Sequence, residues 1–253
     1  MLRRLKRMQR IASYWAPIVN GQFNAYLFFA RAKFGIATAT GCYKGISFHF
    51  RSCDLSAIDE TLMRGEYEFI VPVLAAIPAP MVVDIGMNVG DFSILSMAVN
   101  PRSRIVGVEA DATTAALARS NAPVFSDGSW TVLNRAAWKD NAPVFLQTGA
   151  LSVSTRVSDS GPTSVQGIDL PTLWSELPQQ HVDVLKIDVE GAEEAFLCSH
   201  PDVLANVDHL IIEVHPKACD EGRLRSVLGR AFEIVEDIPG RISSKPLLHC
   251  RRR

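Results

Sequence analysis

The stretch Val82-Val83-Asp84-Ile85-Gly86-Met87-Asn88-Val89-Gly90-Asp91-Phe92 decides how this chain folds. It begins with the apolar residues of a buried strand, continues through a turn with two glycines, and ends where a helix can start. In an open α/β sheet, the turn after the first strand lies at the ligand crevice. Gly86 and Gly90 permit a tight turn and let the main chain approach a ligand closely. The stretch therefore predicts a strand, a ligand-binding loop and a helix.

The segments around this loop alternate between strands and helices. Strands are predicted at residues 81–85, 105–108, 131–133, 182–187 and 208–214, and helices at about 90–99, 111–120, 191–199 and 219–230. The strands are apolar almost without interruption, as expected for a parallel sheet that is covered on both faces. We therefore predict an α/β fold with a doubly wound, mostly parallel, Rossmann-like sheet.

Three segments depart from this alternation. Residues 141–165 contain two alternating runs, 143–147 and 153–157, around a glycine-containing loop, which predicts an inserted β-hairpin. Residues 1–60 are expected to form an N-terminal helical extension, and the catalytic domain is expected at 61–253. The three arginines that end the chain are expected to be a frayed tail. The sequence carries no signal for the oligomeric state.

Composition bounds the size and the environment of the fold. The chain has 253 residues and a formal net charge of −1, so one large core is expected and nucleic acid is not expected as a partner. The five cysteines are widely spaced and odd in number, as is typical of reduced thiols in a cytoplasmic protein. No apolar run is long enough to span a bilayer, and the N-terminus resembles a signal peptide poorly.

The N-terminal basic residues allow two interpretations. Five of the first ten residues are arginine or lysine, and an aromatic and apolar segment follows at residues 26–29. A basic amphipathic helix suits an anionic surface, so the protein could be peripheral to a membrane. The alternative is a helix packed on the domain with its charges in water. The sequence leaves both interpretations open.

Acidic residues at the predicted crevice distinguish two kinds of ligand. Asp84 ends the strand before the loop, and Glu109 ends the next strand. Acids there would repel the pyrophosphate of a dinucleotide, and the spacing of Gly86 and Gly90 also departs from G-x-G-x-x-G. S-adenosylmethionine carries an ammonium and a sulfonium and no phosphate, so acids attract it. We expect Glu109 to accept hydrogen bonds from both ribose hydroxyls, whereas Asp111 suits a helix N-cap as well as an adenine contact.

A second group of charged residues follows the strand at 182–187. Four of them lie in the block Lys186-Ile187-Asp188-Val189-Glu190-Gly191-Ala192-Glu193, and Glu213 and His215 end the next strand. Buried charges are costly, so such a cluster at strand ends usually has a function. Because adjacent strands lie about 4.8 Å apart, Asp188 and Glu213 could converge on one substrate hydroxyl, proton or cation.

These motifs together resemble the FkbM-type methyltransferase family. The resemblance covers about residues 65–216 and rests on the loop at 84–90, Tyr67-Glu68, Glu109, the block at 186–193 and the ending Ile212-Glu213-Val214-His215. It implies the class I methyltransferase fold, S-adenosylmethionine as methyl donor, and O-methylation of a hydroxyl on a sugar, glycan or polyketide-like acceptor. It also implies a set of cofactor-binding residues, namely Glu68, Asp84, Gly86, Asn88, Gly90 and Glu109. Two departures are Met87, where a small residue is usual, and Pro171-Thr172, where an acidic pair is usual.

A hydroxyl acceptor must lose its proton during methyl transfer. We hypothesise that His215 or Asp188 takes that proton while Glu213 orients the acceptor. An alternative is that Asp188 and Glu213 hold a magnesium ion that activates the hydroxyl. Another class of function is an inactive cofactor-binding or scaffold module of a biosynthetic complex. A nicotinamide-dependent oxidoreductase is disfavoured by the glycine spacing and by Asp84.

Overall fold

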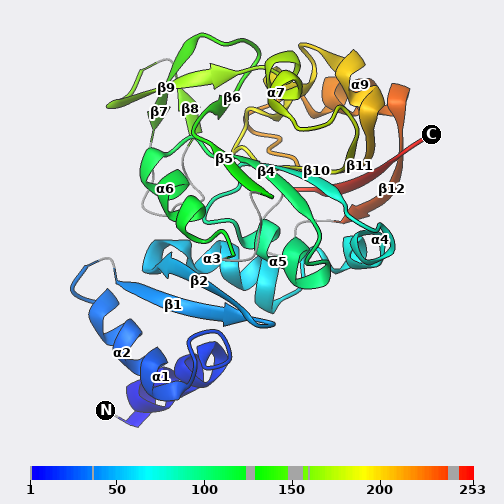
Figure 1. Ribbon diagram of the computed structural model, residues 1–253. Coiled ribbons are helices and arrows are strands. Elements are labelled where there is room, and N and C mark those ends of the chain that lie inside the picture. Colours follow the sequence, from blue (N-terminus) through cyan, green and yellow to red (C-terminus); the bar gives the residue numbers. More distant parts are fainter. Residues whose placement is uncertain (1, 36, 124–128, 148–155, 159, 239–244) are drawn as a thin grey trace.

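A seven-stranded sheet lies at the centre of the protein, with strand order β12-β13-β11-β10-β3-β4-β5 (Figure 1). The computed structural model describes residues 2–35, 37–123, 129–147, 156–158, 160–238 and 245–253. The parallel strands are β3 (Met81–Ile85), β4 (Arg104–Val108), β5 (Trp130–Leu133), β10 (Val182–Ile187) and β11 (Val207–Glu213). Strand β13 (Leu247–Arg252) runs antiparallel between β11 and β12 (Phe232–Ile238). The predicted mostly parallel sheet is confirmed.

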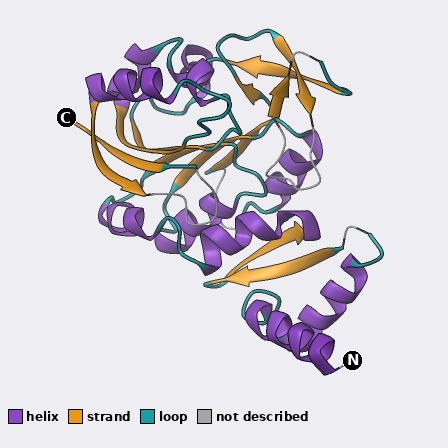
Figure 2. Cartoon of the chain, turned by 180° about the vertical axis from the view of Figure 1, so that it is seen from behind, coloured by secondary structure: helices purple, strands orange, loops and turns teal. Residues whose placement is uncertain are grey.

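Helices cover both faces of this sheet (Figure 2). One face carries α4 (Val71–Ala76), α5 (Asp91–Val99) and α6 (Ala112–Ser120), and the other carries α7 (Leu170–Glu176), α8 (Glu193–Leu197) and α9 (Glu221–Ala231). Within β3, Val82 belongs to the first apolar cluster, whereas Met81 and Val83 belong to the second. Burial on both faces explains why these strands are apolar at nearly every position.

The N-terminal helices predicted within residues 1–60 are present, and a β-hairpin accompanies them. Helices α1 (Leu2–Trp15) and α2 (Gln22–Ala32) are present, but an antiparallel hairpin follows, made of β1 (Thr38–Tyr43) and β2 (Ile46–Arg51). Buried and exposed residues alternate along β2, which is the period of a strand with one covered face. The segment then forms α3 (Leu55–Ile58) and a π-helical turn, Asp59–Met63, so the predicted boundary at residue 60 falls inside this turn.

Two other segments differ from the predictions in detail. Strands β7 (Pro143–Gln147) and β8 (Arg156–Ser158) form the expected antiparallel pair, while residues 148–155 lie outside the described part. This pair belongs to a four-stranded sheet with β6 (Ala136–Ala137) and β9 (Thr163–Ile168). The C-terminal arginines are not simply a frayed tail, because Arg251 and Arg252 lie in β13 and pair with acids of neighbouring strands. Within the described ranges, none of the helices is long and apolar enough to cross a membrane.

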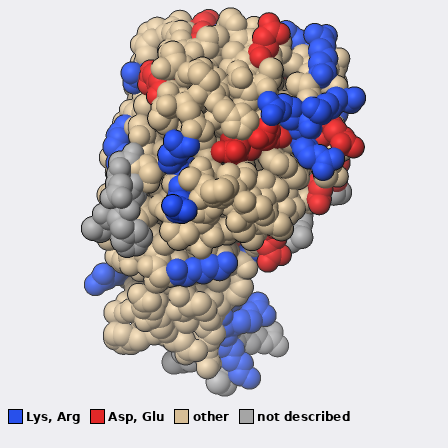
Figure 3. Space-filling view, turned by 45° about the vertical axis from the view of Figure 1, so that its right-hand side comes forward, with Lys and Arg blue, Asp and Glu red and all other residues tan. Residues whose placement is uncertain are grey.

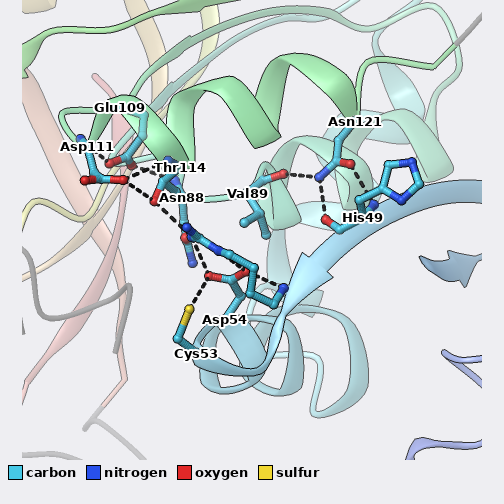
Figure 4. Close-up of polar contacts among 10 residues, drawn as sticks. His49, Cys53, Asp54, Asn88, Val89, Glu109, Asp111, Thr114 and Asn121 are labelled. Carbon is cyan, nitrogen blue, oxygen red and sulfur yellow. Dashed lines mark hydrogen bonds and ion pairs between the residues drawn. The ribbon is translucent and has the colours of Figure 1, made fainter. Parts of the chain in front are cut away.

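The hairpin of the extension is attached to the loop at residues 84–90 through Asn121 (Figure 4). The Asn121 side chain accepts a hydrogen bond from the backbone N–H of His49 (2.7 Å) and donates to the His49 carbonyl (2.9 Å). It also donates to the carbonyl of Val89 (2.8 Å), which lies inside the loop. Nearby, the Arg51 guanidinium donates to buried Asp54 (2.8 Å) and to Thr114 of α6 (2.9 Å). The extension therefore supports the loop directly.

We expect Asn121→Ala to destabilise the protein by about 3 kcal/mol and to lower Tm by roughly 6 to 12 °C. Asn121 is buried, so its loss leaves backbone groups of His49 and Val89 without partners. Thermal unfolding followed by circular dichroism measures the change. The matched control is Asn24→Ala, which removes an exposed amide that bonds only the Asn20 carbonyl. An equal Tm for the two variants would show that the Asn121 contacts contribute nothing.

Candidate active site

A crevice opens over the carboxyl ends of four parallel strands of the central sheet. Its wall contains Gly86 after β3, Glu109 after β4, Asp188 after β10 and Glu213 at the end of β11. The empty space, including the open mouth, is about 850 Å³. Further wall residues come from the N-terminal extension (Ala57, Glu60, Thr61), from the segment before β3 (Glu66, Tyr67) and from the region of the four-stranded sheet (Arg135, Ala136, Ala137, Leu146, Val157). The crevice lies where an open α/β sheet binds its ligand.

The loop after β3 has a backbone shape that depends on glycine. Gly86, Asn88 and Gly90 all have positive φ, at 71°, 51° and 89°. A Cβ at Gly86 would lie 1.8 Å from the Asp188 carbonyl oxygen, so no other residue fits there. Gly90 begins α5 and packs against Trp130, and it is not part of the crevice wall. Gly86 and Asn88 thus line the crevice, whereas Gly90 shapes the loop from outside.

Met87 has a compensating partner in the next strand. Its side chain is buried and lies against Gly107 of β4, where an added Cβ would come within 2.1 Å of the Met87 sulfur. The absence of a side chain at Gly107 therefore makes room for the large residue in the loop. The second departure from the family pattern also has a local role. Pro171 and Thr172 start α7, whose N-cap Asp169 accepts a hydrogen bond from the Thr172 N–H.

Glu109 lies in the crevice wall and holds the loop in place (Figure 4). One carboxylate oxygen accepts the N–H of Asn88 (3.0 Å), and the other accepts the N–H of Asp111 (2.9 Å). Burial raises the pKa of Glu109 to about 7, against the opposing effect of these two N–H groups. Asp111 is the N-cap of α6, since it accepts the Thr114 N–H. The structure thus selects the capping role for Asp111.

The side chain of Asn88 has unused hydrogen-bonding capacity inside the crevice wall. Both its amide nitrogen and its amide oxygen are buried, and neither has a hydrogen-bond partner among the described residues. Buried polar atoms without partners are costly unless something else completes them. Asn88 and Glu109 therefore offer donors and acceptors to a polar ligand that enters beside β4.

Asp84 does not face the crevice, which corrects the prediction that both strand-end acids do so. Its side chain is fully buried, accepts a hydrogen bond from Ser93 of α5 (2.6 Å) and lies 3.4 Å from the Lys186 ammonium. Lys186 also donates to the Gly86 carbonyl (2.9 Å). Burial lowers the pKa of Lys186, but Asp84 and Asp188 outweigh it and raise that pKa above its usual range. Asp84 therefore neutralises a lysine that holds the loop.

The structure brings Asp188, Glu213 and His215 together beside the crevice. One ligand atom from each lies within 4.8 Å of the other two. The Oδ1 atom of Asp188 is buried and has no hydrogen-bond partner in the part of the chain that the structure describes. Burial raises the pKa of Asp188, although Lys186 and His215 oppose the shift. Burial and then Asp188 raise the pKa of Glu213 to about 7.

His215 contacts two acidic side chains, Glu190 and Glu193. It does not line the crevice, and its Nδ1 atom lies 2.6 Å from Glu193 and its Nε2 atom 3.4 Å from Glu190. Burial lowers its pKa, but hydrogen bonds to Glu190 and Glu193 outweigh this and raise the pKa to about 10. Both glutamates thus favour the protonated form of the imidazole. Of the two predicted proton acceptors, Asp188 is the one that lines the crevice.

Several site residues were missed or misplaced by the sequence analysis. Glu68 is exposed and outside the crevice wall, and its neighbours Glu66 and Tyr67 line the wall instead. Lys245 was not predicted at all, yet its ammonium lies 3.1 Å from Glu213 and 3.0 Å from Glu190. It comes from the segment before β13, far from any motif. Its position depends on the antiparallel strand that returns to β11.

The fold is that of the class I S-adenosylmethionine-dependent methyltransferases. The structure is similar to magnesium protoporphyrin IX methyltransferase (ChlM) from Synechocystis PCC 6803 with bound SAH, with a TM-score of 0.50 and 16% identity, over 79% of this chain and 86% of that chain. The FkbM methyltransferase domain matches residues 84–238. The chain therefore belongs to the FkbM methyltransferase family.

A curated relative also matches much of the chain. The 2-O-methyltransferase NoeI from Sinorhizobium fredii (strain NBRC 101917 / NGR234) is 24% identical over 198 residues, which are 68% of this chain and 79% of that protein. The match supports the family assignment.

Proposed function

We propose that this protein transfers a methyl group to a hydroxyl oxygen of a sugar or glycan acceptor. The observation that carries the proposal is the buried, unpartnered Oδ1 atom of Asp188, which belongs to the same crevice wall as Glu109 among the described residues. A hydroxyl needs a proton acceptor at this point, and a carboxylate with a raised pKa is a suitable one. The relative NoeI, a 2-O-methyltransferase, supports oxygen as the acceptor atom.

The crevice residues fit S-adenosylmethionine as the methyl donor. Glu109 would accept hydrogen bonds from the ribose. The amide nitrogen and oxygen of Asn88, which have no partner among the described residues, would form hydrogen bonds with the ligand. Gly86 allows the main chain to approach the ligand closely. The wall is acidic, which favours a positively charged ligand. When bound, this cofactor supplies an electrophilic methyl group on a positively charged sulfur.

The other side chains orient the acceptor and hold the charges in place. Asp188 takes the hydroxyl proton, and Glu213 accepts a hydrogen bond from a second acceptor hydroxyl. Lys245 and His215 flank Glu213 at 3.1 Å and 3.6 Å and fix its carboxylate. Because methyl transfer is a displacement in line, much of the rate enhancement comes from such positioning.

Magnesium is a second candidate at this point, because the ligand atoms of Asp188, Glu213 and His215 lie close together. We favour chemistry by the side chains alone. The Lys245 ammonium already lies against Glu213 and Glu190, so a second cation would have to displace it or share the same carboxylates.

We expect magnesium alone to show no saturable binding in a calorimetric titration, and turnover to survive exhaustive chelation with EDTA. The physical reason is the competition between Lys245 and a divalent cation for the Glu213 carboxylate. Lys245→Met is the matched variant, because it removes the competing charge and would uncover a weak metal site. Loss of wild-type turnover on chelation, with recovery on adding magnesium, would assign the metal instead.

The test of the proposed function is an acceptor screen with methyl-labelled S-adenosylmethionine. Monosaccharides, oligosaccharides and polyketide-like alcohols are incubated with the protein, and NMR locates the methyl group on the labelled product. Label on a sugar oxygen supports the proposal, and label on nitrogen or carbon contradicts it. Cofactor binding by calorimetry without transfer to any acceptor favours the inactive binding module instead.

A further inference from the structure

Charge is distributed very unevenly along this chain. The first 53 residues contain nine lysines and arginines and no acidic residue, because all 27 aspartates and glutamates lie at Asp54 or beyond. In the space-filling view, the end of the molecule formed by α1 and α2 shows basic but no acidic side chains (Figure 3). Lys6, Arg7 and Arg10 of α1 are exposed, and so are Arg31 and Lys33 at the end of α2. This end of the protein therefore has a strongly positive surface.

The same end of the molecule carries exposed apolar side chains on α2. Phe23 and Leu27 are separated by one helical turn and are 73% and 42% exposed, and Phe34, just after the helix, is 94% exposed. The buried residues of α2, Ala25 and Phe28, lie on the opposite side of the helix and pack into the core of the extension. These three side chains form an apolar stripe that nothing in the described chain covers.

An apolar groove also runs between α1 and α2. Ile11 and Ala12 of α1 and Tyr26 and Phe29 of α2 line it, with Lys33 at its edge, and its empty space is about 620 Å³. Exposed apolar side chains usually occur singly on a protein surface, whereas here several are grouped in the groove and the stripe. A ligand for this end of the molecule must therefore satisfy both apolar and cationic groups.

We propose that α1 and α2 form a docking surface for an anionic lipid bilayer, with Phe23, Leu27 and Phe34 inserted among the acyl chains. The surrounding lysines and arginines then contact lipid phosphates. A nucleic acid would use the cations but would leave the apolar stripe in water. A second copy of this chain would bring two strongly basic surfaces together, which is unfavourable. An anionic bilayer satisfies both features.

This surface is linked to the crevice by one short contact. The Tyr14 hydroxyl of α1 donates to the Asp59 carboxylate (2.6 Å), and the next two residues, Glu60 and Thr61, are in the crevice wall. The docking surface and the crevice wall are therefore in contact through neighbouring residues of one turn. The proposal does not depend on the identity of the acceptor.

The experiment is flotation of the full chain with vesicles of phosphatidylcholine alone or mixed with phosphatidylglycerol. We expect binding to the anionic vesicles only. We expect Phe23→Ser/Phe34→Ser and Arg7→Glu/Arg10→Glu each to weaken it by roughly tenfold or more. The controls alter exposed residues elsewhere, with Val235→Ser for the apolar change and Lys139→Glu/Lys217→Glu for the charge change. Circular dichroism and Tm show that each variant is folded.

Four outcomes would overturn the proposal. They are the absence of vesicle binding, equal binding to neutral and anionic vesicles, and equal effects of the control and test variants. The fourth is a dimer in light scattering, without vesicle binding, that Phe23→Ser/Phe34→Ser abolishes, because the stripe would then contact a second copy. Cofactor affinity, measured on the same samples, is expected to be unchanged in all variants. A failure of membrane binding is therefore distinguishable from a failure of the methyltransferase site.

Discussion

We expect Asp188→Asn to lower turnover by at least about 100-fold and to leave cofactor affinity unchanged. Asparagine has nearly the same shape as aspartate but cannot take the hydroxyl proton. The Asp188 carboxylate is the best candidate for that role, because its Oδ1 atom is buried and unpartnered within the described ranges. Burial also raises its pKa and makes it a stronger base than an exposed acid. Turnover is measured on the acceptor from the screen, and affinity by calorimetry.

The matched control for this substitution is Asp202→Asn, which changes an exposed aspartate in the turn before β11. We expect Asp202→Asn to keep the wild-type Tm within experimental error. We expect the Tm of Asp188→Asn to be unchanged or slightly higher, since this substitution removes a buried charge. Unchanged turnover in Asp188→Asn would remove the residue from the mechanism. Loss of cofactor binding together with turnover would move Asp188 from the acceptor to the cofactor.

We expect Glu109→Gln to weaken the binding of S-adenosylmethionine by roughly 10- to 100-fold, because a charge-assisted hydrogen bond contributes about 1.5 to 3 kcal/mol. The carboxylate now accepts the N–H groups of Asn88 and Asp111 at the same time. Glutamine replaces one of these acceptors by a donor, so one N–H group faces another N–H group. The loop around Asn88 should then lose its fixed shape. Calorimetry measures the affinity, and Glu176→Gln on α7 is the exposed control.

The pH dependence of cofactor binding gives an independent check on Glu109. Burial raises its pKa to about 7, so the carboxyl becomes neutral as the pH falls below neutrality. The ionised form attracts a cationic ligand, so wild-type affinity should fall between pH 8 and pH 6, a range that spans about one unit on each side of that pKa. The component due to Glu109 should be missing in Glu109→Gln. Identical pH profiles for the two proteins would contradict the role of this carboxylate.

The sequence was sufficient to predict the five parallel strands of the central sheet and the loop, but not the antiparallel strands β12 and β13. The core strands are buried on both faces, so their apolar character is nearly continuous and unambiguous, as in Met81–Ile85. The glycines of the loop are required by positive φ angles, and such requirements are visible in a sequence. The segment Ile46–Arg51 also has the period of a strand, but the prediction for residues 1–60 included no strand.

Side-chain partners were harder to predict, and Asp84 illustrates the reason. The sequence places it at a strand end, but the register of β3 and β10 puts Lys186 directly beside it. To predict that pairing, one must know which strands are neighbours in the sheet, and no single sequence motif determines the strand order. The same applies to Lys245, which reaches Glu213 only because β13 returns antiparallel to β11.

The π-helical turn Asp59–Met63 connects the N-terminal helix α1 to the crevice wall. Asp59 meets Tyr14 on one side, while Glu60 and Thr61 on the other side help to shape the space for substrates. A fragment that starts after this turn would lack part of its own binding wall. A substitution within this turn would therefore be expected to alter the contact with α1 and the shape of the crevice together.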